Sequence, residues 1–399
     1  MPVISEPEVT VRTCRPEERH QAISIAGGGR DVGAELPLLF PSEPGELLRV
    51  ATVAGEIVGA LPLAACTLVM QEDHLDVALV GPTAVVETHR DRGVEKRLLR
   101  DAADVAERMG CPLSCAWPTS AASAVFAQDG WCPAATQSGR YTLDVSDRDA
   151  LVAGRFVVVP FGRGAGPVLD QLWELHSAVP ARTERGAHQL GLLLTLPGIQ
   201  TFVAGASERI AGYLVLGGDA GSREVREAVG EPAAVEQLLR HALWSLGEGE
   251  SLRVLTPPKM SNNTRHVLEE ILGDRFARRR VEEDPTDDSG RLLVRINQLD
   301  GLLPALLGTL QAGAAASGIT HAETLLRIHG ADRPVHVWLR DGRLSVEPGA
   351  GGVVVDRRQA GGLLFGDGPS DPAVALPETA RWLQRTAPVR LPFWPLDRA

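Results

Sequence analysis

The residues best suited to chemistry in this sequence lie in a short loop that contains Arg90, Arg92 and Gly93. A strand rich in β-branched residues leads into the loop, and a helix is predicted to begin at Val94. A tight turn from a strand into a helix points several backbone N–H groups outward at the positive end of the helix dipole. With two arginines beside them, these groups predict a cradle for a pyrophosphate. The alternative is a surface loop with solvated arginines.

The elements after the loop have the order that such a cradle requires. Apolar residues recur with helical spacing, at Val94, Leu98, Ala102, Val105 and Met109. This pattern predicts an amphipathic helix over residues 94–109. A strand is predicted over 112–117, and a short helix then leads to an aromatic segment that contains Phe126 and Trp131.

Composition limits the classes of function. A chain of 399 residues predicts two or three domains, because one core rarely grows beyond about 250–300 residues. A net charge of −11 argues against a nucleic-acid or anionic-membrane surface. The five cysteines have no metal-site spacing and are interpreted as reduced thiols. No signal peptide or membrane-spanning run is recognised, so we expect a cytoplasmic protein without a metal.

The first unit is predicted over residues 1–150 as a mixed sheet with helices. A hairpin is expected around Ala54-Gly55, between strands at 47–53 and 56–61. The strand from Asp76 to Val86 leads into the arginine loop. Strand 113–117 and a return strand over 140–143 are predicted to complete this sheet.

The second unit, residues 151–290, is predicted to repeat the same plan. Its elements are a strand, a helix, a hairpin, a strand and a helix, predicted at 155–160, 168–178, 200–216, 224–229 and 233–246. The loop before the last helix is Gly230-Glu231-Pro232, which offers an acid in place of arginines, and Pro232 has no N–H to donate. We therefore predict that the second unit does not bind the phosphate ligand.

The third unit is predicted over residues 291–399, after a polar stretch at 284–290. A strand is expected at 292–296. Alternating apolar residues at 335–339 and 343–346 flank Asp341-Gly342, which is a strong hairpin signal.

The segment Arg90-Asp91-Arg92-Gly93-Val94 resembles the coenzyme A signature of the GNAT acyltransferases, Arg-x-x-Gly-x-(Gly/Ala). Over nearly the whole chain, the order of units resembles the enhanced intracellular survival (Eis) family of aminoglycoside acetyltransferases. The similar segments are 88–93, 224–246, 291–299, 344–348 and 363–366. The resemblance implies an α+β fold with two tandem GNAT-like domains, each a mixed sheet flanked by helices, and a C-terminal sterol-carrier-protein-like domain. It also implies a homo-oligomer, often a hexamer, that acetylates amines of small molecules.

Site residues follow from the same resemblance. The pantetheine of acetyl-CoA or another acyl-CoA would lie as an added strand along backbone groups of Thr83, Val85 and Val86. Its pyrophosphate would be held by four residues of the loop and helix start, Arg90, Arg92, Gly93 and Val94.

The general base of the family is the C-terminal carboxylate, which belongs to Ala399 in this chain. The tail contains Phe393 and Trp394 between prolines, which would anchor it, and Asp397 offers a second carboxylate. A frayed or packed terminus is the alternative. Trp117 and Trp131 are candidates for the substrate pocket, with plain core packing as the alternative.

Three residues depart from the family pattern. The position of the general-acid tyrosine is occupied by Phe126, whose ring has no proton to give. Asp91 replaces a basic residue of the loop, and Glu95 adds a negative charge that would repel a pyrophosphate. The leading hypothesis is an acyl-CoA-dependent N-acyltransferase acting on a small-molecule amine. The alternative is a repurposed GNAT-fold enzyme or binding protein of specialised metabolism that no longer transfers acetyl groups.

Overall fold

The computed structural model describes all residues except 1–7, 30–31, 41–46, 119, 135–138, 163–165, 220–221, 257–266, 274, 282–290, 330–332, 367–379, 387–388 and 399. None of the helices in the described residues has the length and hydrophobicity that a bilayer crossing requires. The chain divides into two compact units. One contains residues 1–67, 72–135 and 287–389, and the other contains 68–71, 136–286 and 390–399. In this division the C-terminal third belongs to the first unit and the last ten residues belong to the second.

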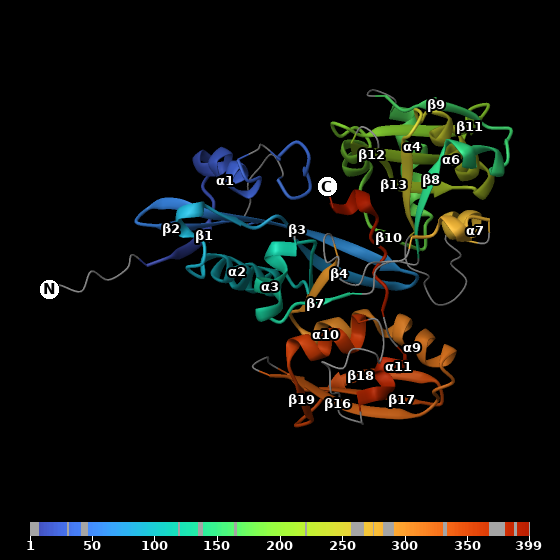
Figure 1. Ribbon diagram of the computed structural model, residues 1–399. Coiled ribbons are helices and arrows are strands. Elements are labelled where there is room, and N and C mark those ends of the chain that lie inside the picture. The colour runs from blue at the N-terminus through green and yellow to red at the C-terminus, as the bar shows by residue number, and fades with distance from the viewer. Residues whose placement is uncertain are drawn as a thin grey trace. The chain divides into compact units, whose positions relative to one another are not determined.

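The main sheet of the first unit has the strand order β1-β2-β3-β4-β6-β15-β7. The strands are β1 (Thr10–Thr13), β2 (Leu48–Val53), β3 (Glu56–Met70), β4 (Asp73–Val80), β6 (Leu113–Ala116), β7 (Cys132–Pro133) and β15 (Leu293–Ile296). Helix α1 (Arg19–Ala26) lies on one side of the sheet, and α2 (Val94–Arg108) and α3 (Ser120–Gln128) lie on the other (Figure 1). The predicted hairpin at Ala54-Gly55 is confirmed, since it joins β2 to β3 with positive φ angles at both residues.

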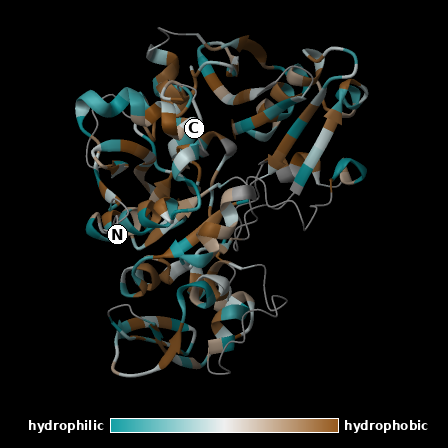
Figure 2. Cartoon of the chain, turned by 60° about the vertical axis from the view of Figure 1, so that its left-hand side comes forward, coloured by the Kyte–Doolittle hydropathy of each residue, from teal (hydrophilic) through white to brown (hydrophobic). Residues whose placement is uncertain are grey.

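Helix α2 supplies much of the core of this unit. Its predicted apolar stripe is confirmed at Val94, Leu98, Ala102 and Val105, which are buried. Met109 follows the last residue of the helix and is 37% exposed, so the stripe ends one turn earlier than predicted. Figure 2 shows many strand residues as hydrophobic and the helices as mixtures of hydrophobic and hydrophilic residues, as expected where one helix face meets a sheet.

Two strands lie in sheets other than the predicted ones. The segment 140–143 was predicted to return into the first sheet, but it forms β8 (Gly139–Asp144), which pairs with β14 (Ser251–Thr256) in the second unit. Its predicted place is taken by β15, which is antiparallel to both β6 and β7. The side chain of Asn297, just after β15, donates to the carbonyl oxygen of Cys111 at 3.0 Å and to Ser114 Oγ at 2.8 Å. Buried hydrogen bonds of this kind fix the register of the inserted strand.

The second unit has the strand order β8-β14-β13-β12-β11-β9. Its other elements are β9 (Val157–Pro160), α4 (Gly166–Ser177), β10 (Ala181–Thr183), α5 (Ala187–Leu193), β11 (Gln200–Ala206), β12 (Arg209–Asp219), β13 (Ser222–Gly230), α6 (Pro232–Trp244) and α7 (Val267–Leu272). Phe202 contacts His241 of α6, whereas Tyr213, which pairs with Val203, contacts His176 of α4. Because neighbouring strand residues point to opposite faces, α4 and α6 cover opposite faces of this sheet.

The C-terminal third forms a separate sheet with the order β18-β17-β16-β19. Its elements are α8 (Leu299–Ala305), α9 (Leu307–Ala316), β16 (Ala322–Ile328), β17 (Val335–Arg340), β18 (Arg343–Pro348), β19 (Val353–Val355), α10 (Arg357–Phe365) and α11 (Arg381–Thr386). The predicted hairpin at Asp341-Gly342 is confirmed, with φ angles of 50° and 75°. The predicted polar stretch at 284–290 lies outside the described residues.

Candidate functional site

The sheet of the first unit opens just before the arginine loop. Strand β4 runs parallel to β6 as far as the pair Val80 and Ala116. The next strand, β5 (Ala84–Val85), pairs instead with β3, and the N–H of Val86 donates to the carbonyl oxygen of Val58 at 2.8 Å. Alternate residues of an antiparallel strand direct their backbone groups to opposite sides. The N–H and C=O groups of Thr83 and Val85 therefore face away from β3, whereas the N–H of Val86 is already used.

The loop after β5 is shaped by two residues in the left-handed region. Asp91 has a φ of 62° and Gly93 a φ of 73°, and α2 begins at the next residue. Among the described residues no side chain caps this helix, and its first turn closes with the bond from Arg97 N to Gly93 O. The N–H groups of residues 94–96 therefore have no partner within the helix and lie at its positive end.

A cavity of about 620 Å³ joins the open strand edge to this helix end. It is lined by Thr83, Ala84, Val85, His89, Arg90, Asp91, Gly93, Val94, Glu95, Lys96, Ala122, Val125 and Gln128. The structure thus brings together most of the residues predicted for the cofactor. Arg92 is exposed and is not part of the lining, and Val86 is also outside it.

Opposite charges share the cavity wall. Arg90 and Lys96 bring positive charge, while Asp91 and Glu95 bring carboxylates. Glu95 is partly buried in the first turn of α2, and this burial raises the pKa of its carboxyl group. Protonation of Glu95 removes one negative charge from the wall, so the field that a bound diphosphate would meet depends on pH.

The aromatic residues predicted for the substrate pocket and the general-acid position do not line the cavity. Phe126 and Trp131 are 2% and 1% exposed, and their rings meet edge to face with centroids 5.0 Å apart. Both belong to the hydrophobic core of the first unit and not to the cavity lining. Trp117 is partly buried just after β6 and is likewise outside the lining. The α3 residues that do line the cavity are Ala122, Val125 and Gln128, which repeat every three positions.

Lys96 and the α3 residues were not among the site residues predicted from the sequence. Lys96 lies in the first turn of α2, three residues after Gly93. This short separation in the sequence is the signal that could have identified it. The α3 residues carry no charge and no hydroxyl group, and the amide of Gln128 is their one polar side-chain group. Only the packing of α3 beside α2 reveals them.

Of the two carboxylates predicted as candidates for the general base, the structure describes one. Ala399 lies outside the described residues. Asp397 is 2% exposed in the second unit, where its Oδ1 accepts from Arg185 at 2.6 Å and its Oδ2 accepts from the N–H of Trp394 at 2.7 Å. Both oxygens are therefore occupied by bonds within that unit, which gives Asp397 a role in holding the tail.

The corresponding loop of the second unit is built differently. Gly230 has a φ of 136°, and a Cβ there would lie 2.3 Å from the Cα of Gly212. Glu231 forms an ion pair with Arg209 at 2.8 Å, and Pro232 opens α6 without an N–H. This helix start therefore has a carboxylate and one fewer donor where the first unit has arginines.

A family model described as an acetyltransferase (GNAT) domain matches residues 37–133. Among curated proteins, none matches the chain. A GCN5-related N-acetyltransferase from Kribbella flavida is 15% identical, with a TM-score of 0.67 over 97% of this chain and 98% of its own. One from Anabaena variabilis is 13% identical, with a TM-score of 0.68 over 97% and 100%. Eis1 from Mycobacterium abscessus is 14% identical, with a TM-score of 0.58 over 97% and 99%.

Residues 37–133, which match the model of a GNAT acetyltransferase domain, include β5, the arginine loop, α2 and α3. The chain has a mixed α+β structure with the GNAT fold. At these identities the solved structures establish the fold alone.

Proposed function

We propose that this protein is an acyl-CoA-dependent N-acyltransferase that acts on an amine of a small molecule. The observation that carries the proposal is the cavity in the GNAT domain, where an unpaired strand edge meets an uncapped helix start. Thr83 and Val85 have backbone groups free to receive the amides of a pantetheine arm. Arg90, Lys96 and the N–H groups of residues 94–96 are suited to a diphosphate. Bound acyl-CoA would supply the activated acyl group.

The finer features of the proposal come from the resemblance to the Eis family. They are a homo-oligomer in the cytoplasm, a sterol-carrier-protein-like domain in the C-terminal third, and the carboxylate of Ala399 as general base. The chain has a fold similar to that of Eis1. The resemblance also gives roles to Arg92, Val86, Trp117 and Trp131, which lie outside the cavity lining. They would fill these roles if ligand binding moved them into contact with the ligand.

A second candidate function is favoured by one feature of the cavity. Its lining contains no tyrosine, because the residue at the expected position, Phe126, is in the core, and two carboxylates stand near the helix start. A repurposed enzyme or binding protein that keeps the GNAT cavity and no longer transfers acetyl groups fits this arrangement.

Isothermal titration with acetyl-CoA and with free coenzyme A tests the proposal. We expect saturable binding, and we expect Arg90→Ala to weaken it by about tenfold or more, because a charge-assisted bond to phosphate is lost. Arg108→Ala is the control, since Arg108 is an exposed arginine at the last position of α2 and outside the lining. Failure of both ligands to bind would contradict the proposal. Binding without acetylation in a screen of amines would favour the second candidate.

A further inference from the structure

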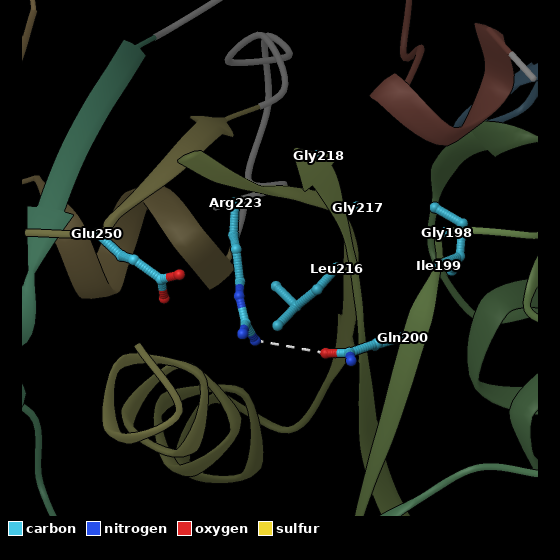
Figure 3. A pocket seen from close by; sticks show the side chains of 8 residues that line it. All are labelled: Gly198, Ile199, Gln200, Leu216, Gly217, Gly218, Arg223 and Glu250. Carbon is cyan, nitrogen blue, oxygen red and sulfur yellow. Dashed lines mark hydrogen bonds between the residues drawn. The ribbon is translucent and has the colours of Figure 1, made fainter. Parts of the chain in front are cut away.

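The second unit contains a separate cavity of about 460 Å³, at the end of its sheet opposite to the Gly230 loop. It is lined by Gly198, Ile199, Gln200, Leu216, Gly217, Gly218, Arg223 and Glu250. Figure 3 shows the side chains of Arg223, in β13, and Glu250, in the loop just before β14, extending toward the same space. Leu216, which is buried, and Ile199 contribute an apolar side. The volume lies within the range of about 300–1,000 Å³ that is usual for small-molecule sites.

The Arg223 side chain is positioned by two hydrogen bonds and has further N–H donors available. Its Nη1 is 3.4 Å from Gln200 Oε1 and 3.2 Å from Ser245 Oγ, which itself donates to the carbonyl oxygen of Ala242. A guanidinium has five N–H donors. Within the described residues, Nε and Nη2 of Arg223 have no protein partner, so they remain available for a planar anion.

Glu250 also has hydrogen-bonding capacity available for a ligand. Its Oε2 accepts from the N–H of Gly247 at 2.7 Å, which fixes the carboxylate at the rim of the cavity. Among the described residues, no cation pairs with Glu250, and no ion pair joins it to Arg223. Two opposite charges that line one cavity without bridging leave room between them for a ligand that satisfies both.

Glycines keep the wall beside Arg223 open. Arg223 pairs across the strands with Gly218, so no side chain stands opposite it. Gly218 has a φ of 104°, and a Cβ there would lie 2.5 Å from the carbonyl oxygen of Ser222. A Cβ on Gly217 would lie 2.9 Å from Ile199 Cδ1. The backbone therefore requires glycine at Gly218, and at Gly217 a side chain would crowd Ile199, so neither residue projects a side chain into the cavity.

We infer that this cavity binds a small zwitterion of the α-amino acid class, with its carboxylate on Arg223, its ammonium on Glu250 and an aliphatic side chain toward Leu216 and Ile199. This site is distinct from the GNAT cavity of the first unit, and the inference does not depend on the proposed acyl transfer.

Saturation-transfer NMR and isothermal titration of the full chain with L-leucine test the inference, with L-valine and L-methionine as further probes. We expect saturable binding of L-leucine at millimolar concentrations. L-Leucine amide, which lacks the carboxylate, and N-acetyl-L-leucine, which lacks the ammonium, should each bind about tenfold more weakly or worse. Equal binding of either derivative would overturn the inference, as would the absence of binding by all three amino acids.

Two variants locate the site. Arg223→Ala and Glu250→Gln should each weaken L-leucine binding by about tenfold or more. Arg209→Ala, which removes an exposed arginine elsewhere in the same unit, should leave binding unchanged. Circular dichroism identifies any variant that fails to fold, and Glu250→Gln keeps the shape of the side chain. Binding that persists at full strength in both site variants comes from another place on the protein and rejects this site.

Discussion

Nη2 of Arg185 donates to Oδ1 of Asp397 at 2.6 Å, and the two residues are 212 positions apart in the sequence. Nη1 of the same guanidinium donates to Oε2 of Glu227 at 2.7 Å. Tyr213 donates to the other oxygen of Glu227, and His176 Nδ1 lies 3.3 Å from it. All five side chains are buried, so the C-terminal segment is attached to the second unit through a desolvated charge network.

Removal of Asp397 is expected to destabilise the second unit. Asp397→Ala leaves the Arg185 charge buried without one of its two carboxylates, and loss of one partner from a buried pair costs about 3–5 kcal/mol. The measurement is the free energy of unfolding in urea. Arg209→Ala, which breaks an exposed pair, is the control and should cost about 0–1 kcal/mol. Equal effects of the two variants would show that the buried pair contributes no more than a surface pair.

Acid is expected to weaken the same network. Burial raises the pKa of Glu227, but Arg185 and His176 outweigh it and lower the pKa to about 2, from an ordinary value of 4.5. The depressed pKa means that Glu227 stabilises the fold above pH 4.5 and that this contribution is lost as the pH falls toward 2. Unfolding followed over this pH range should be less steep in Glu227→Gln than in the wild type. Parallel pH profiles for the two proteins would contradict the assignment.

Glu95 is expected to make coenzyme A binding dependent on pH. Because burial raises the pKa of this carboxyl group, it becomes neutral at a higher pH than an exposed glutamate. The neutral form does not repel a diphosphate, so affinity should rise as the pH falls. Glu95→Gln should bind coenzyme A more tightly at neutral pH and should lose this part of the pH dependence in isothermal titration. An unchanged slope in the variant would assign the dependence to another group.

A tyrosine is expected to place a phenol in the cavity when it is introduced at position 125, and not at position 126. Val125 lines the cavity, whereas Phe126 packs against Trp131 in the core. Phe126→Tyr buries a hydroxyl and should cost about 1–3 kcal/mol without adding a proton donor to the cavity. Val125→Tyr should cost less and should place the phenol in the cavity. Acetylation of a panel of amines, measured beside thermal unfolding, compares the two. A gain of activity in Phe126→Tyr alone would contradict this placement.

A fragment of residues 1–150 is expected not to fold. It lacks β15, which lies between β6 and β7, and it carries β8 without its partner β14. Unpaired strand edges of this kind favour aggregation. Amide NMR spectra of the fragment, compared with those of the full chain, provide the measurement. A dispersed spectrum with a cooperative unfolding transition would show that the inserted strand is dispensable.

Local features were predictable from the sequence, and long-range partners were not. Turns at Ala54-Gly55 and Asp341-Gly342 depend on positive φ angles that these residues favour, and the stripe of α2 depends on helical spacing. The same alternation that marks β8 as a strand says nothing about which sheet it joins. The arginine loop was visible because its residues are contiguous. The network around Arg185 and the cavity around Arg223 were not, because each gathers residues from distant parts of the chain.

The insertion of β15 has a consequence for the order of events at the ribosome. A growing chain leaves the tunnel from its N-terminus, so β6 and β7 emerge long before their common neighbour at Leu293–Ile296. The first sheet cannot close until 296 of the 399 residues have been made. At a synthesis rate of about 5–20 residues per second, the edges of β6 and β7 remain unpaired for about 8–33 seconds. Nascent chains of this protein should therefore depend on a chaperone that covers exposed strands during that interval.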